Sequence, residues 1–256
     1  VFSNRKTCAA IWKADPMRWL AALLIFIASP ALAVTCKDVT YKDNSYTTCT
    51  VNLTTEDLRL FLYDDAGQPL SHFSSVDKAL EPSGKKLAFA MNAGMYHDDR
   101  APVGHYVENG NELMRVIPNA GPGNFGLLPN GVFCIGTGRA DVIETLAFIK
   151  RKPACTYATQ SGPMLVINGA LHPRFLQGSD SRYIRNGVGT SADGKTATFV
   201  ISNNLVNFHS FGSFFRDALK LPNALYFDGN VSRLYAPSIG RADLGFRLGP
   251  IVGVVE

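Results

Sequence analysis

The chain has 256 residues, 46% of them hydrophobic, and a formal net charge of +4. Four of its basic residues precede position 34, so residues 34–256 carry 21 basic and 20 acidic side chains. This near balance gives no reason to expect a nucleic-acid-binding protein, which needs a clear excess of Lys and Arg.

The N-terminal segment is predicted to be a secretory signal peptide. Trp19–Ala28 is an apolar run behind Arg18, and an Ala-x-Ala cleavage site ending at Ala33 follows it. The run is too short to span a bilayer comfortably, which disfavours a retained anchor. Met17 stands directly before Arg18, so residues 1–16 are expected to come from an over-extended start.

Cleavage after the signal would leave residues 34–256, long enough for a single domain with a substantial core. The domain is predicted to be periplasmic or secreted, with no membrane span. Its four cysteines are an even number, typical of an oxidising compartment, and no Cys-x-x-Cys pair favours zinc. Of three possible pairings we favour Cys36–Cys49 with Cys134–Cys155, because each closes a short loop and stabilises by roughly 3 kcal/mol.

Apolar and β-branched segments predict at least six strands, in chain order Leu58–Tyr63, Lys86–Met91, Met164–Ile167, Thr196–Ile201, Ala224–Phe227 and Ile251–Val255. Asn-Gly or Asp-Gly pairs begin at Asn109, Asn168, Asp193 and Asp228, and such pairs are the strongest local signal for antiparallel hairpins. Hairpins therefore outnumber the crossovers that parallel sheets need.

Helices are predicted at only two places. Ser74–Leu80 is one short candidate. Phe211, Phe214, Phe215 and Ala218 follow the spacing of one apolar helix face, which Pro222 would end. The predicted fold class is α+β, a mixed, largely antiparallel sheet with a few helices in a single domain.

Four polar, glycine-centred motifs follow apolar runs, and strands that end in such motifs usually bring them together. They are Asn92–Tyr96, Gln160–Pro163, Arg185–Gly189 and Asp228–Asn230. Glycine allows close backbone approach, while Asn, Ser, Arg and Asp supply donors, acceptors and charge. The glycine-rich loop Gly121–Gly126 has neither a following helix nor the full phosphate-loop spacing, so we do not expect it to bind phosphate.

Asp228 is the best-placed carboxylate for glycoside chemistry, at the tip of the strand Ala224–Phe227. Its Asp-Gly pair equally fits a hairpin turn, so both interpretations stand on local grounds. Four acidic residues qualify by type as a second carboxylate, and nothing in the sequence separates them: Asp98, Asp99, Glu108 and Asp180.

Other chemistries have weaker support. Ser161 lacks the flanking glycines of a nucleophile elbow, so a turn residue whose hydroxyl caps the backbone is favoured there. Arg185 could clamp a phosphate or carboxylate, or could form a structural salt bridge. His97, Asp98, Asp99 and His105 share one loop but match no metal-ligand spacing, so neither a metal nor another cofactor is predicted.

Taken in order, the segments Phe89–Tyr96, Gln160–Met164, Ile184–Gly189 and Ala224–Gly229 resemble the phosphodiester glycosidase family. This family includes the uncovering enzyme, which removes N-acetylglucosamine from a sugar phosphodiester. The resemblance extends over roughly Leu87–Glu256 and is closest to small exported bacterial members.

The resemblance implies a catalytic domain that acts at an anomeric carbon, with these motifs around one pocket. It implies that Asp228 is the catalytic acid or base, that Arg185 clamps the phosphate, and that Asn92 belongs to the same catalytic group. The substrate-binding residues that it implies are Gly94, Tyr96, Ser161, Gly162, Asn186, Gly187, Gly229 and Ser232.

The sequence thus favours an exported hydrolase that cleaves the glycosidic bond of a sugar-1-phosphodiester in an envelope or extracellular glycan. The alternative is a non-catalytic periplasmic protein that binds a glycan or a protein partner through the same cleft. A third and weaker hypothesis is a metal-dependent phosphodiesterase built on the loop from His97 to His105.

Overall fold

The computed structural model describes residues 1–3 and 34–256. The predicted signal sequence and its cleavage site at Ala33 therefore lie outside the described residues, except for the first three. Residues 34–256 belong to one compact unit. None of the described helices has the length and apolar character that a membrane crossing needs.

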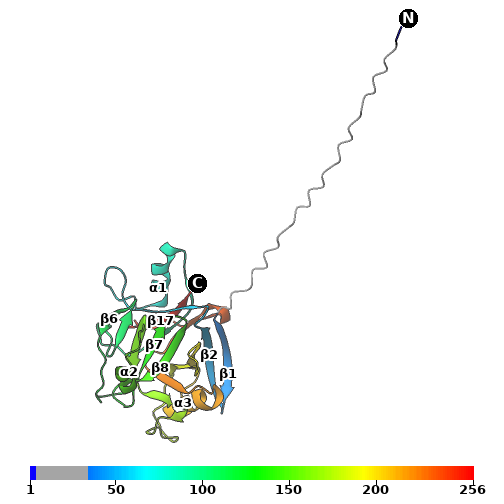
Figure 1. The fold of residues 1–256 in the computed structure, drawn as a ribbon. Helices are drawn as coiled ribbons and strands as arrows, with labels where there is room; N and C mark the ends of the chain where they lie inside the picture. The colour runs from blue at the N-terminus through cyan, green and yellow to red at the C-terminus, as the bar shows by residue number, and fades with distance from the viewer. Residues whose placement is uncertain (4–33) are drawn as a thin grey trace. The chain divides into compact units, whose positions relative to one another are not determined.

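The domain is built from three open sheets (Figure 1). The first has the order β1 (Thr35–Tyr41), β2 (Asn44–Asn52), β13 (Thr196–Ser202), β12 (Asn186–Thr190), β14 (Asn223–Asp228), β10 (Met164–Ile167) and β11 (Ala170–Leu171). The second has the order β16 (Arg241–Ala242), β15 (Leu234–Ala236), β4 (Leu87–Asn92), β17 (Ile251–Val255) and β3 (Asp57–Phe61). The third has the order β6 (Asn111–Met114), β5 (Tyr106–Glu108), β9 (Tyr157–Ser161), β7 (Gly131–Gly136) and β8 (Arg139–Glu144).

Adjacent strands in all three sheets pair antiparallel within the described residues. The six predicted strands correspond to β3, β4, β10, β13, β14 and β17. The largely antiparallel α+β fold predicted from the sequence is therefore confirmed.

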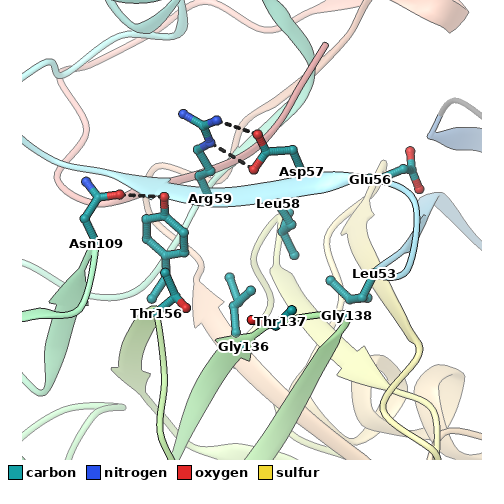
Figure 2. Close-up of a pocket in the computed structure, with 12 residues that line it drawn as sticks. Leu53, Glu56, Asp57, Leu58, Arg59, Asn109, Gly136, Thr137, Gly138 and Thr156 are labelled. Carbon is teal, nitrogen blue, oxygen red and sulfur yellow. Dashed lines mark hydrogen bonds and ion pairs between the residues drawn. The ribbon is translucent and has the colours of Figure 1, made fainter.

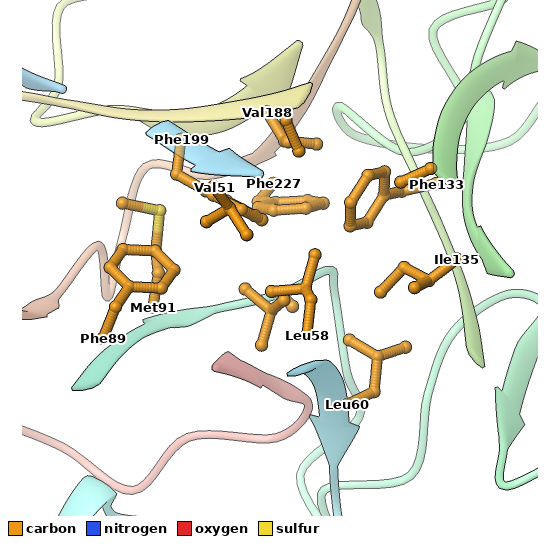
Figure 3. Close-up of a cluster of buried hydrophobic side chains, with 14 of the residues drawn as sticks. Val51, Leu58, Leu60, Phe89, Met91, Phe133, Ile135, Val188, Phe199 and Phe227 are labelled. Carbon is orange, nitrogen blue, oxygen red and sulfur yellow. The ribbon is translucent and has the colours of Figure 1, made fainter. Parts of the chain in front are cut away.

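One apolar core joins the three sheets, as the clustered side chains in Figure 3 show. Phe199 of β13 contacts Phe89 of β4 at 4.9 Å and Phe133 of β7 at 5.8 Å between ring centroids. Phe133 also meets Phe227 of β14 edge-on. These four rings belong to strands of all three sheets, so the sheets are fixed against one another by a shared set of aromatic contacts.

Both predicted helices are present. α1 (Phe73–Leu80) buries Phe73, Val76 and Leu80, the three residues that its apolar spacing places on one face. α3 (Phe208–Ser213) continues into the π-helical turn η2 (Phe214–Ala218), which ends before the predicted stop at Pro222. Sequence analysis missed α2 (Thr145–Arg151), whose first turn is capped by the carboxylate of Glu144.

Three of the four predicted hairpin turns connect paired strands. The pairs that begin at Asn109, Asn168 and Asp193 join β5 to β6, β10 to β11 and β12 to β13. The pair that begins at Asp228 does not, because β14 pairs with β10 and β12 whereas β15, the next strand, pairs with β4 in the second sheet. The hairpin interpretation of Asp228 is therefore wrong: the chain crosses between two sheets there.

Both predicted disulfides are confirmed. Cys36 and Cys49 lie opposite each other on β1 and β2, and Cys134 of β7 bonds to Cys155, which precedes β9. One covalent link therefore joins β1 to β2 at an edge of the first sheet, and the other ties β7 to the segment before β9 in the third sheet.

The core gives a stability prediction. Phe199→Ala should lower the free energy of unfolding by about 3–5 kcal/mol, because it removes a fully buried ring that contacts two other sheets. Urea unfolding followed by circular dichroism measures the change. Leu176→Ala is the control, since Leu176 is 71% exposed and should change stability little. Equal effects of the two substitutions would contradict this account of the core.

Candidate active site

A cavity of about 610 Å³ opens beside the end of β14. Its walls come from three separate segments: the residues after β4, a glycine-rich loop, and β14 with the loop that follows it. They are Met95, Tyr96, His97 and Val103, then Pro122, Gly123, Asn124 and Phe125, and then Tyr226, Asp228, Asn230 and Val231. The first and last predicted motifs are thus brought together in one cavity.

Asp228 is the carboxylate in this cavity. Its Oδ1 accepts hydrogen bonds from the backbone N–H groups of Gly229 (2.6 Å) and Asn230 (2.9 Å), and its Oδ2 accepts one from Val231 (3.1 Å). Burial raises the pKa of Asp228 above its usual value, although the three N–H groups oppose the rise. The carboxyl group is held in a fixed orientation with a pKa moved toward neutrality, which suits proton transfer.

Tyr226 also lines the cavity, and sequence analysis missed it because it reads as an ordinary strand residue. Tyr226 and Asp228 line the same cavity although β14 is bulged between them, where Asn186 pairs with Asp228 and Gly187 pairs with Tyr226. Its hydroxyl accepts a hydrogen bond from Nη1 of Arg185 at 3.2 Å. Burial raises the pKa of Tyr226 and the Arg185 charge opposes the rise, so the hydroxyl remains a proton donor near neutral pH.

Arg185 lies behind Tyr226 rather than in the cavity wall. Its fully buried guanidinium donates from Nε to the Val206 carbonyl and from Nη2 to the Ser181 carbonyl, both at 2.9 Å, and it covers the ring of Phe208 at 3.7 Å. Burial lowers the pKa of Arg185. No carboxylate of the described residues forms an ion pair with it. The sequence predicted that Arg185 would clamp a phosphate directly. In the structure Arg185 does not line the cavity, and its Nη1 donates instead to the hydroxyl of Tyr226, which does.

Three predicted polar residues form a network that joins two sheets beside Asp228. Nδ2 of Asn186 donates to Oδ1 of Asn92 at 2.9 Å, and the Ser232 hydroxyl lies 3.3 Å from Oδ1 of Asn186 and 3.0 Å from the Asp228 carbonyl. Asn92 and Asn186 are fully buried. Their side chains fix the loop that carries Asp228 and do not line the cavity.

The predicted glycines allow close backbone packing behind the site. A Cβ on Gly187 would lie 2.4 Å from the Leu225 carbonyl oxygen, and one on Gly229 would lie 2.4 Å from the Tyr226 hydroxyl. Gly94 has φ +90°, and a Cβ there would meet the Thr159 hydroxyl at 2.6 Å. Gly187 lies inside β12 and does not follow a strand as the sequence predicted. Only glycine at this position lets β14 approach β12 so closely.

The second motif packs beneath the site as well. Ser161 is fully buried at the end of β9, and its hydroxyl donates to the Phe227 carbonyl at 3.3 Å. A Cβ on Gly162 would lie 2.7 Å from that of Asn130. Neither residue lines the cavity, so this motif supports β14 from below.

Tyr96 lies between positive and negative groups at the cavity. The Arg100 guanidinium covers its ring at 5.2 Å, and its hydroxyl donates to the Arg247 carbonyl at 3.1 Å. Burial is the main cause that raises the pKa of Tyr96; Asp228 adds to the rise, while Arg100 and Arg233 oppose it. The charges of Arg100, Arg233 and Asp228 therefore all influence the pKa of the Tyr96 hydroxyl.

No second carboxylate lines the cavity within the described residues. Asp98, Asp99 and Asp180 are exposed, and Glu108 accepts a hydrogen bond from the Tyr106 hydroxyl at 2.8 Å on another sheet. The part of the chain that the structure describes contains no group of three or more His, Cys, Asp and Glu residues able to hold a metal ion. His105 instead packs against Phe148.

Another cavity, of about 410 Å³, lies between β3 and the β7–β8 hairpin (Figure 2). Arg59 forms an ion pair with Asp57 there, and Asn109 accepts a hydrogen bond from the Tyr157 hydroxyl at 2.7 Å. The cavity beside Asp228 is the better candidate, because it gathers residues of two predicted motifs.

The model of the phosphodiester glycosidase family matches residues 85–242. An Escherichia coli K12 protein, "Uncharacterized protein YigE", is 33% identical over 208 residues, which are 80% of this chain and 81% of that protein.

Two solved structures share the fold. A hypothetical protein from Synechocystis has a TM-score of 0.58 at 14% identity, over 87% of this chain and 61% of its own. The zebrafish N-acetylglucosamine-1-phosphodiester alpha-N-acetylglucosaminidase catalytic domain, auto-inhibited by its pro-peptide, has a TM-score of 0.56 at 14% identity, over 90% of this chain and 83% of its own. At such identities the likeness shows the fold alone.

The raised pKa of Asp228 predicts a pH-dependent difference in stability. A carboxyl group with a higher pKa in the folded state stabilises the fold fully below its unfolded pKa, and that contribution is lost as pH rises through the folded value. Asp228→Asn should therefore gain stability relative to the native chain as pH rises above about 4. Thermal unfolding of the native chain and the variant, at pH values below and above about 4, measures this difference in stability. Asp180→Asn, at an exposed carboxylate, is the matched control. A difference for Asp228→Asn that does not change with pH would contradict the raised pKa.

Proposed function

Because the chain belongs to the phosphodiester glycosidase family, we propose that it hydrolyses the glycosidic bond of a sugar-1-phosphodiester in an envelope or extracellular glycan. The observation that carries this proposal is the oriented Asp228 carboxyl, with its raised pKa, in a cavity that Tyr226 and Tyr96 share. Guanidinium groups act on both tyrosines, so the surroundings favour an anionic substrate.

Asp228 acts in this proposal as the proton acceptor. A water molecule adds to the anomeric carbon and gives its proton to the carboxylate, while the bond from that carbon to the phosphate oxygen breaks. The phosphate leaves with the bonding electron pair. A phosphate needs no strong general acid, so a single carboxylate in the cavity wall is sufficient.

Tyr226, whose hydroxyl accepts from Arg185 and keeps its own proton free to donate, would stabilise the departing phosphate. Arg185 orients the Tyr226 hydroxyl and makes it a better hydrogen-bond donor through its uncancelled charge. Arg100 supplies positive charge on the other side, over the Tyr96 ring. In this scheme Arg185 is a positioning residue that acts through Tyr226.

The remaining predicted site residues shape and support the cavity. Asn92, Asn186 and Ser232 hold the loop of Asp228, so their loss should misplace the carboxylate. The site glycines and Ser161 let β9, β12 and β14 pack tightly enough to align it.

The two disulfides support a location outside the cytoplasm, where oxidised cysteines persist. A periplasmic or secreted enzyme would meet glycans and their turnover products there.

The first activity test compares the native protein with Asp228→Asn on a panel of sugar-1-phosphodiesters, with released sugar followed by mass spectrometry. Native protein should release sugar, and the variant should be slower by about 10²–10⁴-fold, the usual contribution of a proton-transferring side chain. Asp180→Asn should retain native activity. Substrate that binds without any release by the native protein would instead favour the non-catalytic glycan-binding alternative, and an active Asp228→Asn would refute the assignment of the carboxylate.

A second test removes only the Tyr226 hydroxyl. Tyr226→Phe should lower kcat by about 10²–10³-fold with a smaller effect on KM, because the lost hydrogen bond is made to the leaving group in the transition state. Tyr183→Phe, at a 44% exposed tyrosine outside the cavity, is the matched control. A change confined to KM would show that Tyr226 stabilises the bound substrate and the transition state equally, which contradicts a role specific to the leaving group.

A further inference from the structure

Arg233 carries a buried positive charge that the catalytic proposal does not use. The residue is only 6% exposed, and its backbone N–H donates to Oδ1 of Asn92 at 2.9 Å. Its Nε and Nη2 atoms are buried and have no hydrogen-bond acceptor among the described residues. A buried guanidinium is costly without partners, so such donors point to a ligand or to ordered water.

The Arg233 side chain faces a cavity of about 430 Å³, separate from the one beside Asp228. This cavity, called here the α1 cavity, is lined by residues of the α1 N-terminus, by β15 and by the loop before β17. They are His72, Phe73, Ser74, Asp77, Arg233, Tyr235, Ala242, Asp243, Leu244 and Gly245. A Cβ on Gly245 would lie 3.3 Å from Cδ and 3.4 Å from Nε of Arg233, so the loop backbone packs directly along the side chain.

The N-terminus of α1 supplies further donors to this cavity. The cap residue His72 makes no side-chain hydrogen bond, and the first turn contains no acidic residue. The backbone N–H groups of Phe73 and Ser74 donate to no protein acceptor in the described chain. Free N–H groups and the helix dipole at such an end favour an anion.

The two carboxylates in the α1 cavity have other partners. Oδ1 of Asp77 accepts the Leu87 N–H at 2.7 Å, and both oxygens of Asp243 accept hydrogen bonds from Arg241. Neither forms an ion pair with Arg233. A further guanidinium is close, since Nε of Arg247 donates to the Ser71 hydroxyl just before the helix.

We propose that the α1 cavity binds a phosphate group, held by the Arg233 guanidinium and the backbone N–H groups of Phe73 and Ser74. The planar fork of Arg and the helix N-terminus both match phosphate oxygens. The Arg233 backbone N–H and the Asn186 side chain both donate to Oδ1 of Asn92, so this site adjoins the candidate active site. Phosphate binding in the α1 cavity goes beyond the proposed hydrolysis, because it involves no bond cleavage.

Calorimetric titration of the purified protein with inorganic phosphate, at constant ionic strength in chloride, tests the site. Saturable binding that depends on Arg233 is expected. Arg233→Met should weaken it at least tenfold, and Ser74→Glu should do the same by placing a carboxylate at the exposed start of α1. Ser74→Gln, with the same shape and no charge, should bind like the native protein. Arg139→Met, at an exposed arginine paired with Asp141, controls for the loss of a cation.

The outcomes separate cleanly. No saturable binding, or equal binding by Ser74→Glu and Ser74→Gln, would overturn the site even if Arg233→Met failed to fold. The titration detects binding without any turnover, so failure of the catalytic proposal would leave this one standing. A parallel titration with glucose 6-phosphate distinguishes the source of the group: binding at least tenfold tighter than inorganic phosphate would indicate a sugar phosphate, and equal binding would indicate the free anion.

Discussion

The ring contacts among Phe89, Phe133, Phe199 and Phe227 are the constraint on which the rest of the molecule depends. They hold three separate sheets against one another. This packing brings together the last residues of β4 and β14 and the first residue of β12. Asn92, Asn186 and Asp228 stand at those ends. Apolar packing inside the domain thus determines where its polar residues meet.

The polar side chains next to this core are largely buried, and almost all of their hydrogen-bonding groups have partners. Asn92 and Asn186 bond across two sheets, and the Asp228 carboxylate takes three backbone donors. Arg185 is balanced by carbonyls and aromatic faces rather than by a carboxylate, so its charge is not cancelled. Such pre-oriented charge acts without reorganisation when a reaction develops negative charge nearby. Arg233 differs, since its donors lack protein partners.

The sequence was sufficient for those features that depend on local chemistry. Alternating and continuous apolar segments located β4, β10 and β14, and Asn-Gly or Asp-Gly pairs located three hairpins. It could not show that Asp228-Gly229 leaves its sheet, because a turn residue and a crossover residue look alike until the next strand chooses its partner. It could not show that Arg185 donates to the Tyr226 hydroxyl, because that contact joins residues 41 positions apart. The α1 cavity was missed for the same reason, since Arg233 and Ser74 meet only in the folded domain.

The disulfide between Cys36 and Cys49 protects one edge of the seven-stranded sheet. β1 is one of the two edge strands of the seven-stranded sheet, and such an edge is a ready template for pairing with another chain. A covalent bond to β2 prevents that strand from peeling away and exposing the longer β2 in its place. The bond therefore guards against aggregation and strand exchange at the edge of the sheet whose centre carries Asp228.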